Sequence, residues 1–284
     1  MVLWRDETES EAAFKQRLEE LGVKAKYTKI DAGQDRAKLA EAMRGIEADI
    51  AAKKFDLIYT YGTTVTQVAQ SVVNNSTPIV FTIVFDPVGG KLVKSMEEPG
   101  VNATGVTNGV PINDQFDAIQ KVSPIQNLCM VFDARVPNSN LVERQVNDWA
   151  KAHSVPMTSL RVAPGNDSLD RALDDIKTDK VKCDVVYAGA DSYIASEATK
   201  IRDAVGDKVK LFGGTETFIL RGWLGAYATR VQDMGATAAD LGAKILAGGD
   251  ASKIPVVLPQ PHMFLTEASA TKFGITVPGD AIKR

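Results

Sequence analysis

Acidic residues follow two apolar runs in the second half of the chain. Asp191 comes shortly after Val185–Ala188, and Thr215 and Glu216 come shortly after Lys210–Phe212. Short β-branched and aromatic runs are typical of buried strands. A carboxylate beside a strand end can hold an ammonium group through a charge-assisted hydrogen bond. We expect Asp191 to bind a ligand in this way, with Thr215 and Glu216 beside it. Helix capping by Asp191 and a first-turn helix position for Glu216 are the alternatives.

Hydroxyl groups and a carboxylate follow two apolar runs in the first half of the chain. Thr63 and Thr64 come after Leu57–Tyr59, and Asp86 comes directly after Pro78–Phe85. Threonine can cap a helix, and Asp followed by Pro is typical of a helix start, so the sequence predicts a helix after each run. The free N–H groups at two helix N-termini would suit a carboxylate or a phosphate. Ordinary turns, with Asp86 only as a cap, are the alternative.

Three aromatic side chains and one arginine stand near the same strand ends. Trp4 and Arg5 follow the first apolar run, and Tyr61 and Phe85 stand at the ends of the two central runs. An aromatic ring can stack on a planar ligand, and a guanidinium can pair with a carboxylate. We count all four among the ligand-binding residues. A core position for Trp4 and a solvated position for Arg5 are the alternatives.

Strand-like and helix-like segments alternate along the whole chain. Helical spacing of apolar residues predicts helices over residues 10–21, 35–54, 65–74, 113–122, 139–153, 168–178, 193–205 and 234–247. Short apolar runs predict strands over residues 1–4, 24–30, 57–59, 78–85, 127–132, 158–162, 185–188, 210–212 and 224–229. This alternation indicates βαβ units and parallel sheets. Because the pattern restarts after a Gly/Asn-rich stretch that ends at Asn108, we expect two sheets of similar design.

The central block of the sequence resembles a known family. Asp-Pro-Val-Gly at residues 86–89 and Asn-Ala-Thr-Gly-Val at residues 102–106 are similar to ABC-transporter substrate-binding proteins of the tryptophan/tyrosine-binding type. Further similar segments are residues 78–81, 92–93, 99–100, 243–249 and 273–278, so the resemblance covers nearly the whole chain. It implies an α/β protein with the type I periplasmic binding protein fold, in which two Rossmann-like lobes with parallel sheets are joined by a multi-strand hinge. The implied lobes are residues 1–107 with 230–260, and residues 108–229 with 261–284.

The resemblance also implies roles for single residues. In the family, the loop that matches residues 61–64 makes polar contacts to the ligand, and an acidic residue faces the ligand where this chain has Asp191. An Asn/Ser-rich loop of the family matches Asn138 and Ser139, which makes Asn138 a candidate ligand contact; helix capping by either residue is the alternative. Family members commonly carry a small residue where this chain has Phe85, so the shape of the pocket depends on that ring.

The resemblance implies an extracytoplasmic solute-binding protein of an ABC importer. Hydroxyls and helix N-termini of the first lobe would hold a carboxylate, and acids of the second lobe would hold an ammonium. The lobes would then close around a small zwitterion, which we expect to be an amino acid with an aromatic or other apolar side chain, or a close derivative. The expected partners are ABC permease subunits, and the expected state is a monomer.

Two other functions remain as alternatives. One is a ligand-sensing receptor that presents its ligand to a signalling partner. The other is a two-lobed enzyme, against which the sequence has no nucleophile elbow, no Gly-x-Gly-x-x-Gly and no P-loop. We therefore expect no enzymatic activity, no cofactor and no metal, and the two histidines lack the spacing of zinc ligands.

The composition agrees with a globular protein that does not bind nucleic acid. Hydrophobic residues make up 44% and charged residues 24% of the chain, and the net charge of −3 gives no electrostatic reason to expect a nucleic-acid partner. Cys129 and Cys183 are expected to be buried free thiols, with a disulfide as the alternative if their strands are adjacent. The N-terminus shows no leader-like segment. We expect a periplasmic or lipid-anchored protein whose leader has been removed; a cytosolic protein is the alternative.

Overall fold

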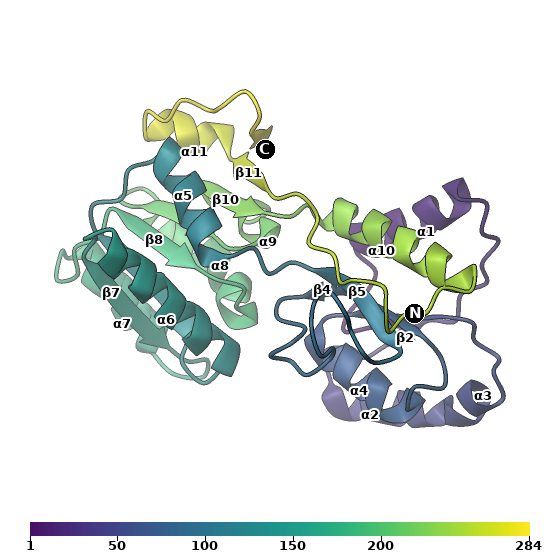
Figure 1. Cartoon of the computed structure of the whole chain (residues 1–284). Coiled ribbons are helices and arrows are strands. Elements are labelled where there is room, and N and C mark those ends of the chain that lie inside the picture. The colour runs from purple at the N-terminus through teal and green to yellow at the C-terminus, as the bar shows by residue number, and fades with distance from the viewer. The chain divides into compact units, whose positions relative to one another are not determined.

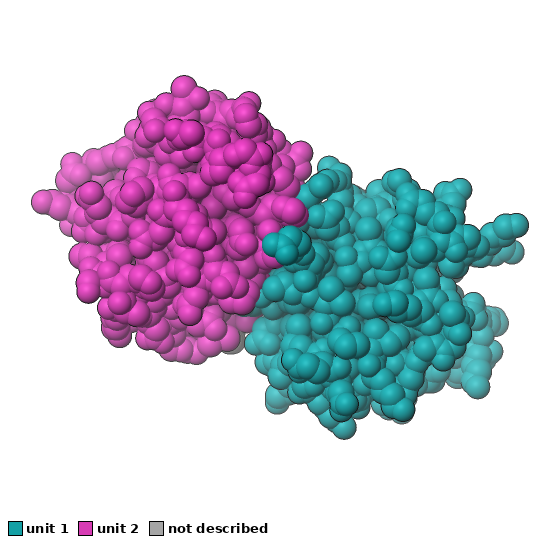
Figure 2. Space-filling view, turned by 45° about the horizontal axis from the view of Figure 1, so that its top comes forward, with its two compact units in different colours: residues 1–109, 229–260 teal, residues 110–228, 261–284 magenta. Residues whose placement is uncertain are grey.

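The structure is a computed structural model that describes residues 1–284, except for the side chain of Pro137. Contacts within the chain group it into two compact units, which Figure 2 shows in different colours. Unit 1 consists of Met1–Gly109 and Thr229–Gln260, and unit 2 consists of Val110–Ala228 and Pro261–Arg284. Each unit has its own sheet with helices packed on it, so the protein has the α/β architecture that the alternation predicts.

Among the described residues, the sheet of unit 1 has five strands in the order β2–β1–β3–β4–β5. All neighbouring strands pair in parallel. The strands are β1 (Val2–Leu3), β2 (Ile30–Asp31), β3 (Ile58–Tyr61), β4 (Ile79–Val84) and β5 (Ala103–Thr107). Parallel strands place all their carboxyl ends at one edge of the sheet, and the candidate residues of unit 1 follow β1, β3 and β4 at that edge.

Helices cover both faces of this sheet. The helices of unit 1 are α1 (Glu9–Glu20), α2 (Arg36–Gly45), α3 (Glu47–Ala51), α4 (Thr63–Val73) and α10 (Val231–Leu246). Leu39 of α2 and Val65 of α4 belong to one buried cluster, whereas Phe14 of α1 and Ala238 of α10 belong to another. Figure 1 shows α10 lying beside α1, although more than two hundred residues separate them in the sequence.

The described part of unit 2 has a sheet of seven strands in the order β12–β11–β10–β9–β8–β6–β7. The strands are β6 (Leu128–Asp133), β7 (Met157–Val162), β8 (Val185–Ala188), β9 (Lys210–Gly213), β10 (Gly225–Ala228), β11 (His262–Leu265) and β12 (Ile282–Lys283). Strands β10 and β11 pair in an antiparallel manner, and the other neighbours pair in parallel. The antiparallel pair is a feature that the sequence pattern did not predict.

The helices of unit 2 also pack on two faces. They are α5 (Ile112–Val122), α6 (Pro137–Ala152), α7 (Ser168–Lys177), α8 (Ser192–Val205), α9 (Glu216–Ile219) and α11 (Glu267–Lys272). Helices α7 and α8 bury an apolar cluster against β6 and β8. On the other face, Phe116 of α5 lies between Trp149 of α6 and Tyr187 of β8, with ring centroids 4.5 and 4.8 Å apart.

The helix predicted after Asp86 does not form. Residues 86–92 make turns instead, in which the N–H of Gly90 donates to the carbonyl of Asp86. The Asp86 carboxylate accepts the N–H of Gly89 at 2.7 Å and so closes a turn rather than capping a helix. Two consecutive glycines oppose a helix here, because each costs about 1 kcal/mol relative to alanine. The prediction of a second helix N-terminus at this edge was wrong.

Three other predicted elements differ from the structure. The strand expected over residues 24–30 is present only from Ile30, because residues 24–29 are exposed and offer no apolar face. The helix expected over residues 35–54 is divided into α2 and α3 directly after Gly45, a residue of low helix propensity. The Gly/Asn-rich stretch before Asn108 contains β5 rather than a linker alone.

Candidate functional site

Thr63 and Thr64 lie in the first turn of α4, at the carboxyl end of β3, and both are half-buried. The N-cap of this helix is Gly62, whose φ of 84° is a conformation that glycine adopts readily. Among the described residues, no side chain forms a capping hydrogen bond at this end, so the prediction of a threonine cap was wrong. The first N–H groups of α4 therefore have no side-chain acceptor and can donate to an anion.

A guanidinium lies beside this helix end. Arg5 lies in the exposed loop after β1, and its positive charge acts on the hydroxyl of Tyr61, which ends β3. Burial raises the pKa of Tyr61, and the positive charge of Arg5 offsets part of that rise. Trp4 is half-buried and packs against the cluster that includes α2 and α4, so its side chain is divided between the core and the surface. The structure thus places Arg5 near enough to Tyr61 for its charge to act on the phenol group.

The carboxyl end of β4 has an irregular backbone. The pairing of β4 with β5 shifts register between Phe81 and Val84, and Ile83 has a φ of 55°. A positive φ is unusual for a β-branched residue and stores strain that its surroundings must hold. Phe85 and Asp86 follow this bulge and are half-buried. Bulges of this kind redirect the side chains that follow them, and they are common next to binding sites.

Glu11 of α1 is a buried carboxylate in unit 1 that the sequence analysis did not identify. Glu11 is fully buried in the first turn of α1 and accepts a hydrogen bond of 2.5 Å from the hydroxyl of Tyr59. Its other oxygen accepts the N–H and the hydroxyl of Thr8, each at 2.7 Å. The Tyr59 hydroxyl also lies 2.9 Å from that of Thr82, and burial and Glu11 raise the pKa of Tyr59. The capping-box pattern from Thr8 to Glu11 was the available signal.

In unit 2, the carboxylate of Asp191 is engaged inside the protein. Asp191 is 4% exposed and is the N-cap of α8, where one oxygen accepts the N–H of Ile194 at 3.0 Å. Its other oxygen accepts the N–H of Asp133 at 2.8 Å and the hydroxyl of Ser139 at 2.7 Å. The side chain therefore ties the end of β6, the first turn of α6 and the start of α8 together. Asn138 is half-buried in the first turn of α6.

Neither Asn138 nor Ser139 caps a helix, which was the alternative role for both. The N-cap of α6 is Val136, and no described side chain caps this helix. Ser139 instead donates to Asp191, as described above.

Arg135 is a second residue that sequence reasoning missed. Its Nε and Nη2 donate to the two oxygens of Asp133 at 3.0 and 2.9 Å, which is a bidentate pair. The Arg135 side chain is 59% exposed, whereas that of Asp133 is 3% exposed. Hydrogen bonding from Arg135 holds the pKa of Asp133 below its usual value, against the effect of burial. The pair fixes a guanidinium at the carboxyl edge of β6.

Thr215 and Glu216 stand at the start of the short helix α9. Thr215 is its N-cap without a side-chain capping bond among the described residues, and Glu216 is in the first turn. Glu216 is 4% exposed, and its Oε1 accepts a hydrogen bond of 2.7 Å from Nη2 of Arg284. The carboxylate of Glu216 is therefore already paired with a cation of the same unit.

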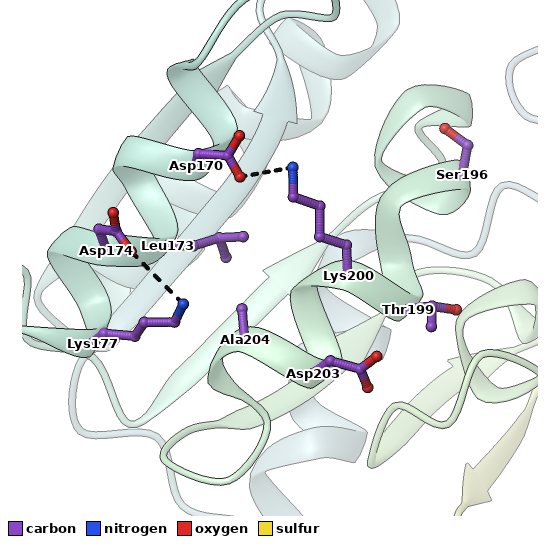
Figure 3. A pocket seen from close by; sticks show the side chains of 9 residues that line it. All are labelled: Asp170, Leu173, Asp174, Lys177, Ser196, Thr199, Lys200, Asp203 and Ala204. Atoms are coloured by element: carbon purple, nitrogen blue, oxygen red, sulfur yellow. Dashed lines mark ion pairs between the residues drawn. The ribbon is translucent and has the colours of Figure 1, made fainter.

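A groove lies elsewhere on unit 2, between α7 and α8 (Figure 3). It has a volume of about 680 Å³, and Leu173 and Ala204 lie between its charged walls. Ion pairs of 2.7 Å between Lys200 and Asp170 and of 3.7 Å between Lys177 and Asp174 line it. Its described lining includes none of the residues expected to bind the ligand, so we do not assign the ligand to this groove.

The described residues contain neither a metal-binding group of side chains nor a helix that could cross a membrane. No group of three or more His, Cys, Asp and Glu side chains is arranged to hold a metal ion. Within the same residues, none of the helices combines the length and the apolar character that crossing a bilayer requires.

Residues 7–284 match the model of a protein family described as ABC transporter substrate binding protein. A curated relative, the "Tyrosine-binding protein" of Clostridioides difficile (strain R20291), is 24% identical over 227 residues. These residues are 79% of this chain and 64% of the relative, so the match spans less than two thirds of the relative's length.

Solved structures share the fold over nearly the whole chain. The ligand-free, open structure of CD0873, a substrate binding protein with adhesive properties from Clostridium difficile, has a TM-score of 0.82 at 19% identity and covers 100% of this chain and 97% of that one. A domain from Streptococcus pneumonia in complex with L-Trp has a TM-score of 0.81 at 19% identity and covers 99% and 97%. The substrate binding protein LivJ from Streptococcus pneumoniae, in complex with isoleucine, has a TM-score of 0.61 at 11% identity and covers 89% and 84%. These similarities show the type I periplasmic binding protein fold.

Proposed function

This chain belongs to the family of ABC transporter substrate-binding proteins, and we propose that it binds an amino acid with an aromatic side chain for an ABC importer. Proteins of this kind bind and present a substrate and are not enzymes. The observation that supports this choice of ligand is the nearness of the Arg5 charge to Tyr61 at the carboxyl edge of the unit 1 sheet. Arg5 can pair with the carboxylate of a ligand, and Tyr61 offers an aromatic ring at the same edge of the sheet. The tyrosine-binding relative and the L-Trp-bound structure support the same ligand class.

We assign the ligand carboxylate to unit 1. Arg5 is exposed and charged, and the first N–H groups of α4 and the hydroxyls of Thr63 and Thr64 lie at the same sheet edge. A guanidinium and a helix N-terminus both stabilise a carboxylate. Trp4 and Phe85, which are half-buried at this edge, supply apolar surface for the ligand side chain.

We assign the ligand ammonium to the acidic residues of unit 2. Asp191 is the preferred partner, because Oδ1 accepts a single described hydrogen bond and a carboxylate oxygen can accept two. Glu216 ranks below it because its carboxylate is paired with Arg284. Asn138 and Thr215 complete the proposed contacts, and Asp86 shapes the loop after β4 through its turn with Gly89.

Isothermal titration calorimetry tests this assignment with L-tyrosine, L-tryptophan, L-phenylalanine and L-leucine. We expect the aromatic amino acids to bind most tightly. Tyramine, which lacks the carboxylate, and 3-(4-hydroxyphenyl)propionate, which lacks the ammonium, should each bind at least about tenfold more weakly than L-tyrosine, or ~1.4 kcal/mol. If no amino acid binds, the proposed function is wrong.

A variant and its control test the role of Arg5. Arg5→Gln should weaken L-tyrosine binding by about tenfold and leave tyramine binding unchanged, because the removed charge has no partner in tyramine. Arg171→Gln is the matched control, since Arg171 is an exposed residue paired with Asp167 on unit 2. If Arg5→Gln weakens both ligands equally, the carboxylate lies elsewhere and only this part of the proposal fails.

We also propose the partners and the location. Substrate-binding proteins of ABC transporters are extracytoplasmic, and we propose that this one is a monomer, free in the periplasm or lipid-anchored, that docks on permease subunits. Cell fractionation followed by detergent phase separation distinguishes a free from an anchored protein. Co-purification with a membrane fraction that contains the permease, increased by the bound amino acid, would support docking; recovery of the protein from the cytosol alone would contradict the location.

A further inference from the structure

The carboxylate of Glu11 links α1 to the sheet of unit 1. It is fully buried, and its Oε2 accepts the N–H and the hydroxyl of Thr8, each at 2.7 Å. Its Oε1 accepts the hydroxyl of Tyr59 on β3 at 2.5 Å. A capping box requires only the contact with the N-cap residue, here Thr8. The bond to Tyr59 is therefore an additional link, from the first turn of α1 to β3.

The same network continues to β4 and to the start of α4. The Tyr59 hydroxyl lies 2.9 Å from that of Thr82, which is fully buried on β4. The carbonyl of Thr82 accepts the N–H of Gly62, the N-cap of α4, at 2.9 Å. Ile83, the next residue on β4, has the φ of 55° described above. Because Tyr59 donates to Glu11, its oxygen can accept from Thr82, so the hydrogen bonds support one another along the network.

The loop that carries Arg5 is held at both of its ends. At its start, Leu3 is buried in β1, and the carbonyl of Leu3 accepts the N–H of Ala32 at 2.9 Å. At its end, Glu11 holds both the backbone and the side chain of Thr8. A side chain on a loop is placed precisely only where the supporting hydrogen bonds are themselves fixed. The position of Arg5 therefore depends on the bonds that Glu11 makes.

The other described side-chain contact of this loop is more accessible to solvent. Glu7 pairs with Lys15 at 2.6 Å, and the two side chains are 34% and 32% exposed. Ion pairs that water and salt can reach contribute little to stability. Water does not compete for the buried bonds of Glu11, so we take Glu11 as the residue that holds the loop.

We propose that Glu11 and Tyr59 are positioning residues for ligand binding, which hold the loop of Arg5 and the start of α4 in the arrangement that binds a carboxylate. This inference rests on the proposed function, in which Arg5 pairs with the ligand carboxylate. Both residues are buried and act through the groups that they hold, not through contact with the ligand. Their loss should reduce affinity only for a ligand that has a carboxylate, because correct placement of Arg5 has no value for any other ligand.

Isothermal titration calorimetry of Glu11→Ala with L-tyrosine and with tyramine tests the proposal. Glu11→Ala removes the acceptor of Thr8 and Tyr59, so L-tyrosine should bind at least about fivefold more weakly, whereas tyramine should bind within about twofold of wild type. Glu11→Gln is the conservative variant. Its amide oxygen can accept from Thr8 and its amide nitrogen can donate to Tyr59, so it should bind L-tyrosine within about twofold of wild type.

A double-variant cycle separates positioning from a general loss of stability. In the protein that already carries Arg5→Gln, the change Glu11→Ala should not weaken L-tyrosine binding further, because the side chain that Glu11 positions is no longer present. Ser159→Ala is the matched control, since it also removes a hydrogen bond of a glutamate, the 2.6 Å bond that Ser159 donates to Glu143 in unit 2. This control should change the affinity for neither ligand.

Tyr59→Phe is the second variant if Glu11→Ala fails to fold. It removes one hydroxyl and keeps the ring beside Phe14, where the ring centroids are 4.6 Å apart. We expect a smaller loss of affinity, again for L-tyrosine and not for tyramine.

Two results would overturn the inference and leave the proposed function intact. One is an equal loss of affinity for L-tyrosine and tyramine in Glu11→Ala. The other is a cycle in which the effects of Arg5→Gln and Glu11→Ala simply add. A wild-type protein that binds no amino acid would overturn the proposed function, and this inference with it.

Discussion

At the scale of single residues, the carboxylate of Asp191 joins three elements of unit 2. It accepts hydrogen bonds from Asp133 of β6, Ser139 of α6 and Ile194 of α8. Asp191→Ala should lower the free energy of unfolding by about 2–4 kcal/mol, because a helix cap is lost and two buried donors lose their acceptor. Urea unfolding measures this change.

Asp170→Ala is the control for this prediction. Asp170 is an exposed residue of α7 that pairs with Lys200, and its removal should change the free energy of unfolding by less than about 1 kcal/mol. If both variants lose the same stability, Asp191 does not tie the three elements together.

The pair of Asp133 and Arg135 predicts a pH dependence of stability. Arg135 holds the pKa of Asp133 below its ordinary value of 3.8. A carboxyl whose pKa is lowered by folding stabilises the folded state above its unfolded-state pKa, and the stabilisation is lost as the pH falls through the folded-state pKa. Arg135→Gln should therefore lower the urea midpoint at neutral pH, and this difference from wild type should disappear in strong acid.

Urea midpoints of both proteins, measured in parallel at neutral and at strongly acidic pH, check this pH dependence. Arg171→Gln removes an exposed arginine that pairs with an equally exposed aspartate, and it should change neither midpoint. A cost of Arg135→Gln that is equally large at both pH values would point to lost packing rather than to the charge pair.

The sequence indicated where polar groups would lie but not what they would touch. Asp191 could be placed after a strand from its position alone, whereas its partner Ser139 is 52 residues away and is brought to it by the pairing of β6 with β8. Arg135 was visible in a polar loop, but only the structure shows that Asp133 fixes its guanidinium. Contacts of this kind depend on strand register, which a single sequence does not give.

At the scale of elements, α1 and α10 pack closely at Gly235. A Cβ atom on Gly235 would lie 2.0 Å from the carbonyl oxygen of Ser10, and backbone atoms cannot move aside cheaply. Gly235→Ala should therefore push the two helices apart and lower the free energy of unfolding by about 1–3 kcal/mol. Thermal unfolding followed by circular dichroism measures the loss.

Gly45→Ala is the matched control for the helix pair. Gly45 ends α2, and a Cβ atom there would have no neighbour within 4 Å. Alanine is the better helix former, so this variant should be as stable as wild type or up to about 1 kcal/mol more stable. A loss at Gly45 as large as that at Gly235 would show that both effects are due to the backbone rather than to the contact with α1.

The spacing of apolar residues predicted the elements correctly where one face of the helix or strand is apolar. It failed where a hydrogen bond of a single side chain determines the backbone conformation. The spacing of Phe14 and Leu18 predicted α1, and the strand that contains β4 was predicted from its apolar run. After Asp86 the Asp-Pro pair suggested a helix, but the side chain of Asp86 closes a turn with Gly89. The helical period of residues 234–247 gave no indication that α1 is the partner of α10.

At the scale of the whole molecule, each unit is assembled from separate segments of the chain. Unit 2 receives β11, α11 and β12 from residues 261–284, and Phe264 and Leu265 of β11 are completely buried. A chain that ends at Gln260 should therefore lose the packed structure of unit 2, because the edge of β10 and its apolar face are uncovered.

Tryptophan fluorescence detects this loss, since Trp149 and Trp223 are both buried in unit 2. The truncated chain should show red-shifted emission. A chain that ends at Asp280 loses β12 and Arg284, the partner of Glu216, and should keep the emission of the full chain at a lower stability. Unchanged emission from the chain that ends at Gln260 would mean that unit 2 folds without its last segment.

The pairing of α1 with α10 has a consequence for biosynthesis. The ribosome makes α10 roughly 200 residues after α1, which at about 5–20 residues per second is a delay of roughly 10–40 s. Throughout that delay Phe14 and Leu18 of the nascent polypeptide lack the helix that covers them. The first segment of unit 1 therefore cannot complete its packing before α10 has left the ribosome.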